Sequence, residues 1–315
     1  MRKQQLLIVV SAVMAVLILL NTTALLAQTT QDPVPPVLGE FDPASISEID
    51  PANYPILPEL TDFAREIFER GQQRDVPRNP HMFSKVGDSM TASEHFLVPF
   101  GAGEYDLGKY SELQAVVDYF TSAADVVGNS AFNRANYANA LGFSTASALD
   151  STWAVAEVCE PNESPLACEY RVSNSAFALI MFGTNDVIAF DESLFDFFLR
   201  SVILETIQQD VVPVLYTMPI RPEAPGLSEA FNQIVLRIAA DWDLPVINLV
   251  VALEHLPNFG VDLEDTLHLT LPEAPATAAT FTEAGLTGGY TVRNLVTLQA
   301  LEALLTGLDL LPSEN

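Results

Sequence analysis

Residues 176–182 read AFALIMF, a continuous apolar run that leads directly into Gly183-Thr184-Asn185-Asp186. A strand that is buried on both faces has this composition, whereas a strand with one face in water alternates apolar and polar residues. Strands of the first kind occur mainly in parallel sheets that carry helices on both sides. The run therefore predicts an α/β fold.

Three further apolar runs fit the same role, at residues 81–86, 211–218 and 245–250. Amphipathic patterns with helical spacing flank these runs, at residues 60–70, 193–208, 227–242 and 291–305. Strands that alternate with such helices predict a three-layer α/β/α sandwich with a mainly parallel sheet. Ligands bind beyond the carboxyl ends of the strands in this architecture, so the residues after each run are the candidate site.

The residues at these strand ends form a set that suits nucleophilic catalysis. Ser89 follows the first run, Asn185 follows AFALIMF, and Asp265 and His268 lie in the loop before the last helix. A serine hydroxyl needs an adjacent base, which His268 can supply, and Asp265 can orient and stabilise the imidazole. The Asn185 side-chain amide and the Ser89 backbone N–H can donate hydrogen bonds to an oxyanion. These residue types predict acyl transfer.

Three short blocks in this set resemble those of the SGNH/GDSL hydrolase family. They are Gly87-Asp88-Ser89, Gly183-Thr184-Asn185-Asp186 and Asp265-Thr266-Leu267-His268. The blocks stand in the family's order, and the resemblance covers roughly residues 83–305. It implies a flavodoxin-like three-layer α/β/α sandwich, the SGNH hydrolase fold.

The resemblance also implies a role for each site residue. Ser89 would be the nucleophile, His268 the base and Asp265 the residue that orients it, while Asn185 would donate to the oxyanion. A glycine N–H completes the oxyanion hole in the family. Gly142 fits the family's spacing best, and Gly128 is the second candidate.

The N-terminus has the order of a secretory signal. Arg2 and Lys3 precede an apolar run at residues 6–20, and small residues follow up to Ala27. The run is short for a membrane span, which needs about 20 apolar residues. Residues 1–27 are therefore either a cleaved signal peptide or an N-terminal anchor, and both predict a secreted or otherwise extracytoplasmic protein.

The remaining chain divides into a proline-rich linker and capping segment at residues 28–78 and a hydrolase-like domain at residues 79–310. Segments near 96–110 and 154–171 are expected to be insertions. Insertions at the carboxyl edge of a sheet commonly shape a substrate cleft.

The charge balance is strongly acidic. The whole chain carries −27, and without residues 1–27 the remaining 12 basic and 41 acidic residues give −29. Nucleic acid is therefore not expected as a partner, because phosphate binding needs clustered Lys and Arg. A small-molecule, lipid or acylated-carbohydrate ester is the expected substrate, and membrane contact is expected only through an uncleaved anchor.

Cys159 and Cys168 are predicted to form a disulfide, because a close pair in an oxidising compartment is usually oxidised. The segment between them has no His and no second Cys pair, so no metal site is expected there. The chain has no GxGxxG and no glycine-rich phosphate loop, and no cofactor is expected.

These observations predict a secreted serine hydrolase that cleaves carboxylic esters through an acyl-enzyme on Ser89. It would be a GDSL-type esterase or lipase, or a carbohydrate acetylesterase. The alternative is a non-catalytic extracellular binding module on the same fold, which a large separation of Ser89 and His268 would favour. His81, His95 and His255 are expected to be structural or exposed.

Overall fold

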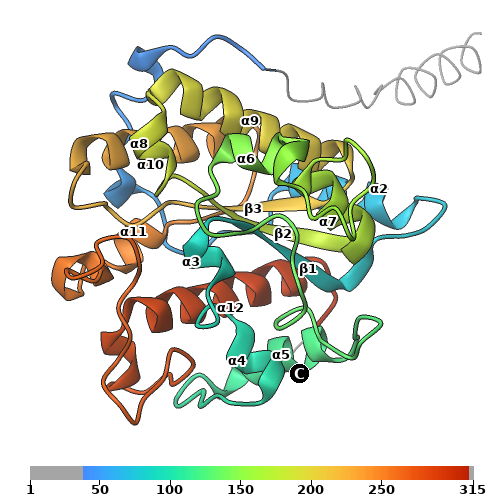
Figure 1. Cartoon of the computed structure of the whole chain (residues 1–315). Coiled ribbons are helices and arrows are strands. Elements are labelled where there is room, and N and C mark those ends of the chain that lie inside the picture. The colour runs from blue at the N-terminus through green and yellow to red at the C-terminus, as the bar shows by residue number, and fades with distance from the viewer. Residues whose placement is uncertain (1–37, 312–315) are drawn as a thin grey trace, which may run out of the picture. The chain divides into compact units, whose positions relative to one another are not determined.

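An open sheet of parallel strands forms the centre of the fold (Figure 1). The computed structural model describes residues 38–311, so the predicted signal or anchor lies outside the described residues. Within them the sheet has the order β1-β2-β3-β4, with β1 at Asn79–Gly87, β2 at Ser175–Met181, β3 at Val212–Tyr216 and β4 at Val246–Ile247. Every residue of β2 is buried. The prediction of an α/β fold with a parallel sheet is confirmed.

Helices cover both faces of the sheet (Figure 1). One face carries α5 (Gln114–Thr121) and α12 (Gly289–Gly307). The other carries α6 (Thr145–Leu149), α7 (Pro165–Ser173), α9 (Glu192–Gln208) and α10 (Pro225–Asp241). The remaining α-helices are α2 (Asp62–Gln72), α3 (Ser89–Ala92), α4 (Val98–Ala102), α8 (Asp186–Ala189) and α11 (Leu249–Ala252). Single 3₁₀ turns lie at Pro43–Ser45, Pro51–Asn53, Ser111–Leu113, Ser151–Trp153, Pro257–Gly260 and Gly285–Thr287.

The last predicted strand is shorter than its apolar run. Residues 245–250 were expected to form a strand, but β4 ends at Ile247 and α11 begins at Leu249. Asn248 separates the two elements because its side chain turns to the N-terminal segment, where Nδ2 donates to the carbonyl of Pro51 at 2.8 Å. A short apolar run suits a buried strand and a buried helix equally well, so periodicity alone does not separate them.

An irregular segment flanks β1 on its outer side. Asn139 pairs with Gly87 in an isolated parallel bridge, and its Nδ2 donates to the Lys85 carbonyl at 2.8 Å. Asn136 Oδ1 accepts the Lys85 N–H at 2.8 Å. A flavodoxin-like sheet has a full strand in this place. Here asparagine side chains supply part of the hydrogen bonding to β1. Asparagine rarely forms regular strands, and this segment pairs with β1 only through one isolated bridge.

The two expected insertions differ in structure. Residues 96–110 contain α4 and surface turns, whereas residues 165–171 of the second segment belong to α7, which packs against β1. Cys168 lies on α7 and forms the predicted disulfide with Cys159. Among residues 38–311, no helix is both long and apolar enough to cross a membrane.

Candidate active site

Ser89 lies where β1 turns into α3. Asp88 caps the helix, and its Oδ1 accepts the Met90 N–H at 2.9 Å. Only glycine fits at position 87, because a Cβ there would lie 2.4 Å from the Met181 carbonyl oxygen. This close contact lets the chain leave the sheet sharply and presents Ser89 as the first residue of α3.

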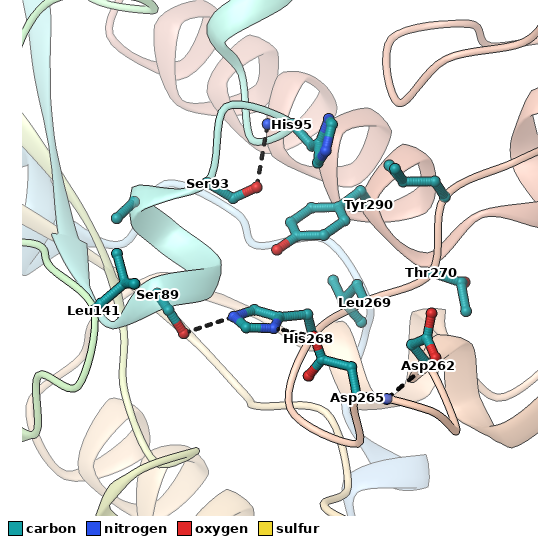
Figure 2. Close-up of a pocket in the computed structure, with 12 residues that line it drawn as sticks. Ser89, Ser93, His95, Leu141, Asp262, Asp265, His268, Leu269, Thr270 and Tyr290 are labelled. Atoms are coloured by element: carbon teal, nitrogen blue, oxygen red, sulfur yellow. Dashed lines mark hydrogen bonds and ion pairs between the residues drawn. The ribbon is translucent and has the colours of Figure 1, made fainter.

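A continuous hydrogen-bond chain joins Ser89, His268 and Asp265 (Figure 2). Ser89 Oγ lies 2.9 Å from His268 Nε2, and His268 Nδ1 lies 2.7 Å from Asp265 Oδ2. The structure thus brings Ser89 to His268, which lies 179 positions later in the sequence, and to Asp265 three positions before that histidine. With Nδ1 donating to Asp265, Nε2 is free to accept the serine proton.

The loop of Asp265 is shaped by its own backbone contacts. Asp265 Oδ1 accepts the Leu267 N–H at 3.0 Å, and the Asp262 N–H donates to the His268 carbonyl at 3.0 Å. Partial burial opposes ionisation of Asp265, but the hydrogen bonds from His268 and Leu267 outweigh it and lower the pKa of its carboxyl group. Asp265 is therefore ionised at neutral pH and can stabilise an imidazolium.

Asn185 is held by the loop that also contains Gly142. Its Nδ2 donates to the Phe143 carbonyl at 2.8 Å, which leaves one N–H of the amide free. The neighbouring Asp186 is buried and accepts the backbone N–H groups of Thr145 at 2.9 Å and Gly183 at 3.1 Å. Asp186 therefore joins the loop of Asn185 to the loop of Gly142. Neither Asp186 nor Asp88, which caps α3, makes a hydrogen bond to Ser89 Oγ among the described contacts.

The two candidate oxyanion glycines differ in the state of their N–H groups. The Gly128 N–H donates to the Asp125 carbonyl at 3.1 Å, so it is already used in a turn. The Gly142 N–H has no hydrogen-bond partner among residues 38–311, and Gly142 is exposed at a φ of 78° with open space around it. Gly142 is thus the better candidate of the two.

A cavity of about 550 Å³ opens beside the serine. Its apolar wall comes from Ala92, Leu141, Leu269 and Leu271, and its polar wall from Ser93, His95, Asp262, Thr270 and Tyr290. Figure 2 shows the Tyr290 ring between His268 and Ser93. The cavity can hold a small acyl group or alcohol, and its walls offer both apolar surface and hydroxyl groups.

His95 differs from its expected place. It lines the cavity, and its ring centroid lies 5.6 Å from that of Tyr290. The reason is that α3 ends at Ala92 and Ser93 takes an extended conformation, so the chain turns back toward the site. His81 instead stacks on Tyr119 at 4.2 Å, and His255 is exposed, as expected.

Sequence reasoning did not find Tyr290 or the leucines of the cavity. Tyr290 lies in the first turn of α12. The only sequence feature that could have indicated it is its position in the helix that follows the loop of Asp265 and His268. In the described part of the chain, one group of three metal-binding side chains comes together, at Cys159, Glu163 and Cys168. The two thiols of this group form the disulfide.

No model of a known protein family matches the chain, and no curated protein does. Solved structures of GDSL-type esterases and lipases are similar to it. Esterase EstA of Pseudoalteromonas sp. is 14% identical, with 72% of this chain and 99% of that chain covered and a TM-score of 0.46. A lipase/acylhydrolase of Enterococcus faecalis is 17% identical, with coverages of 56% and 77% and a TM-score of 0.37. A GDSL-like lipase of Bacteroides thetaiotaomicron is 14% identical, with coverages of 76% and 98% and a TM-score of 0.36.

Proposed function

We propose that this chain is a serine hydrolase of the SGNH/GDSL type that cleaves carboxylic esters through an acyl-enzyme on Ser89. The observation that carries the proposal is the hydrogen-bond chain from Ser89 Oγ through His268 to Asp265, with distances of 2.9 and 2.7 Å. A serine hydroxyl at neutral pH becomes a useful nucleophile only with such a base, and the base needs a group that orients it.

The proposed reaction has two halves. Ser89 Oγ attacks the ester carbonyl while His268 Nε2 takes the hydroxyl proton, and His268 then gives this proton to the departing alcohol. Water next attacks the acyl-enzyme, with His268 again as the base, and the acid leaves as Ser89 regains its proton. Asp265 stabilises the imidazolium in both halves.

The oxyanion of each tetrahedral intermediate would be bound by three donors. These are the backbone N–H groups of Ser89 and Gly142 and the free N–H of the Asn185 amide. The Ser89 N–H makes no hydrogen bond within residues 38–311, and neither does the Gly142 N–H, so both are available. The bond from Asn185 to Phe143 fixes the direction of the remaining amide proton.

We infer that the substrate is a neutral ester of a small molecule, a lipid or an acylated carbohydrate. The charge of −29 on residues 28–315 slows the approach of polyanions. The N-terminal signal pattern and the disulfide support a secreted or extracytoplasmic protein. We further propose one enlarged hydrolase domain over residues 79–310, with residues 28–78 as its linker and cap.

A non-catalytic binding module remains the competing function, and the short distance between Ser89 and His268 speaks against it. The test is hydrolysis of p-nitrophenyl acetate together with labelling by a fluorophosphonate. We expect Ser89→Ala to abolish both. Ser201→Ala is the matched control, because Ser201 is a half-buried serine on α9, outside the cavity, that bonds only to the Phe197 carbonyl among the described contacts. Equal labelling of the two variants would refute the proposed function.

A further inference from the structure

A mostly buried arginine donates a hydrogen bond to the loop that carries Asn185. Arg221 lies in the loop between β3 and α10, and its side chain is 11% exposed. Its Nη1 donates to the Thr184 carbonyl at 2.7 Å, one residue before Asn185. Its Nε donates to Glu223 Oε2 at 3.2 Å. Arg221 therefore joins the backbone beside Asn185 to a carboxylate on a different loop.

The same carboxylate reaches the loop of the catalytic base. Glu223 Oε1 accepts a hydrogen bond from the Thr266 hydroxyl, and Thr266 stands between Asp265 and His268. Thr266 has a φ of 57°, in the left-handed region that a β-branched residue rarely adopts. A contact that holds its side chain therefore supports a backbone conformation that the residue alone disfavours.

We propose that Arg221 and Glu223 are positioning residues, which hold the loop of Asp265 and His268 at a fixed place relative to the loop of Asn185. The contacts run from the Thr184 carbonyl through Arg221 and Glu223 to the Thr266 hydroxyl. This inference rests on the proposed function. None of the three side chains meets the substrate directly, because none of them lines the cavity beside Ser89.

The chemistry of esters explains why these two loops need a link. The base on one loop and the oxyanion donor on the other must both be aligned with the same carbonyl carbon, and a misplacement of about 1 Å can cost about 100-fold in rate. The two loops are 81 positions apart in the sequence at Asn185 and Thr266, with no covalent constraint between them. Asp186 fixes the loop of Asn185 to the loop of Gly142. The Arg221–Glu223 pair in turn links the loop of Asn185 to the loop that carries His268.

The charge state of Glu223 suits a positioning role. The hydrogen bond from Thr266 and the nearby Arg221 guanidinium lower the pKa of Glu223. The carboxylate therefore stays ionised over the pH range in which His268 must be neutral, and it remains an acceptor for both partners.

The test uses the full chain and the pair Thr266→Val and Thr266→Ser. Valine keeps the shape of threonine and removes the hydroxyl, whereas serine keeps the hydroxyl. We expect kcat for p-nitrophenyl acetate to fall about 10-fold to 100-fold in Thr266→Val, with KM changed less than about twofold. Thr266→Ser should restore kcat to within about threefold of the parent. A merely structural role would lower the folded fraction and leave the kcat of the folded protein unchanged.

A double-mutant cycle with Arg221→Met tests the link itself. Because both substitutions break one chain of contacts, the double variant should lose no more than about twofold beyond the worse single variant. The matched control is Glu163→Gln, which breaks an arginine–glutamate pair with Arg171 on the α7 side and should leave kcat unchanged. A kcat of parental size in Thr266→Val, an equal loss in Thr266→Ser, or fully multiplicative losses in the cycle would each overturn the inference. The proposed function fails separately, if Ser89→Ala keeps its activity.

Discussion

The carboxyl group of Asp88 is an unusual cap, because it is completely buried. Asp88 is 0% exposed, and one of its oxygens accepts the Met90 N–H, while Oδ2 has no hydrogen-bond partner among residues 38–311. Burial raises the pKa of Asp88 from 3.8 to about 6, and the Met90 N–H and the nearby Arg293 only partly oppose it. We predict that Asp88→Asn stabilises the protein at neutral pH, since asparagine keeps the acceptor oxygen and removes the buried charge.

The sign and size of this effect follow from proton linkage. Between pH 3.8 and about 6 the folded protein binds more protons at Asp88 than the unfolded chain does, so the contribution of Asp88 to stability falls as the pH rises. A pKa raised by this amount corresponds to a loss of about 3 kcal/mol in the free energy of unfolding, which is complete once the pH is well above 6. The advantage of Asp88→Asn in free energy of unfolding should therefore grow from near zero at pH 3.5 to about 3 kcal/mol at pH 7.

The assay is urea unfolding at several pH values, with both proteins in the same buffers. Asp150→Asn is the matched control, because Asp150 caps a 3₁₀ turn in the same way but is exposed, and hydrogen bonds from Thr152 lower the pKa of its carboxyl group. Asp150→Asn should lower the free energy of unfolding at pH values above the pKa of an unfolded aspartate. This loss should grow as the pH rises, whereas Asp88→Asn should gain stability over the same range. An Asp88→Asn advantage that does not change between pH 4 and pH 7 would refute the reasoning.

Two further predictions concern Asn185 and the disulfide. Asn185→Ala should lower kcat about 100-fold to 1,000-fold with little change in KM, because it removes one of the three proposed oxyanion donors. Steady-state kinetics measure this, and a loss confined to KM would contradict the proposed role. Replacing both Cys159 and Cys168 by serine should reduce the free energy of unfolding by about 2–3 kcal/mol, the loop-closure value for a short loop. Urea unfolding measures the loss, and kcat should not change, since the disulfide lies outside the cavity.

The parallel sheet could be predicted from the sequence because its strands are buried on both faces. The run at 176–182 overlaps β2, and the patterns at 193–208 and 227–242 match α9 and α10 to within two residues. Local composition carries this information, since a strand between two helix layers must be apolar at every position. The end of β4 could not be predicted, because the decisive contact is between Asn248 and the distant Pro51 carbonyl.

Some residues of the candidate site could be predicted from the sequence and others could not. Ser89, Asn185 and the pair Asp265–His268 each follow a strand or precede the last helix, so a parallel sheet alone predicts that they meet at one edge. The position of His95 at the cavity could not be predicted, because it depends on the early end of α3 at Ser93. Three residues lie between Ser89 and Ser93, and no propensity rule requires a helix to end after one turn there.

The residues proposed to position the site could not be recognised from the sequence. Arg221, Glu223 and Thr266 belong to no periodic pattern, and each would pass as a surface residue in isolation. Their importance comes from contacts across 37 and 43 positions of chain, from Arg221 to Thr184 and from Thr266 to Glu223. Reacting groups can be recognised by residue type, because chemistry restricts which side chains can act as nucleophile or base. A positioning contact needs only a donor and an acceptor at the right distance, and many residue types supply these. The supporting residues of such a site must therefore be found from the structure, and their substitution should reduce kcat while the reacting groups remain in place.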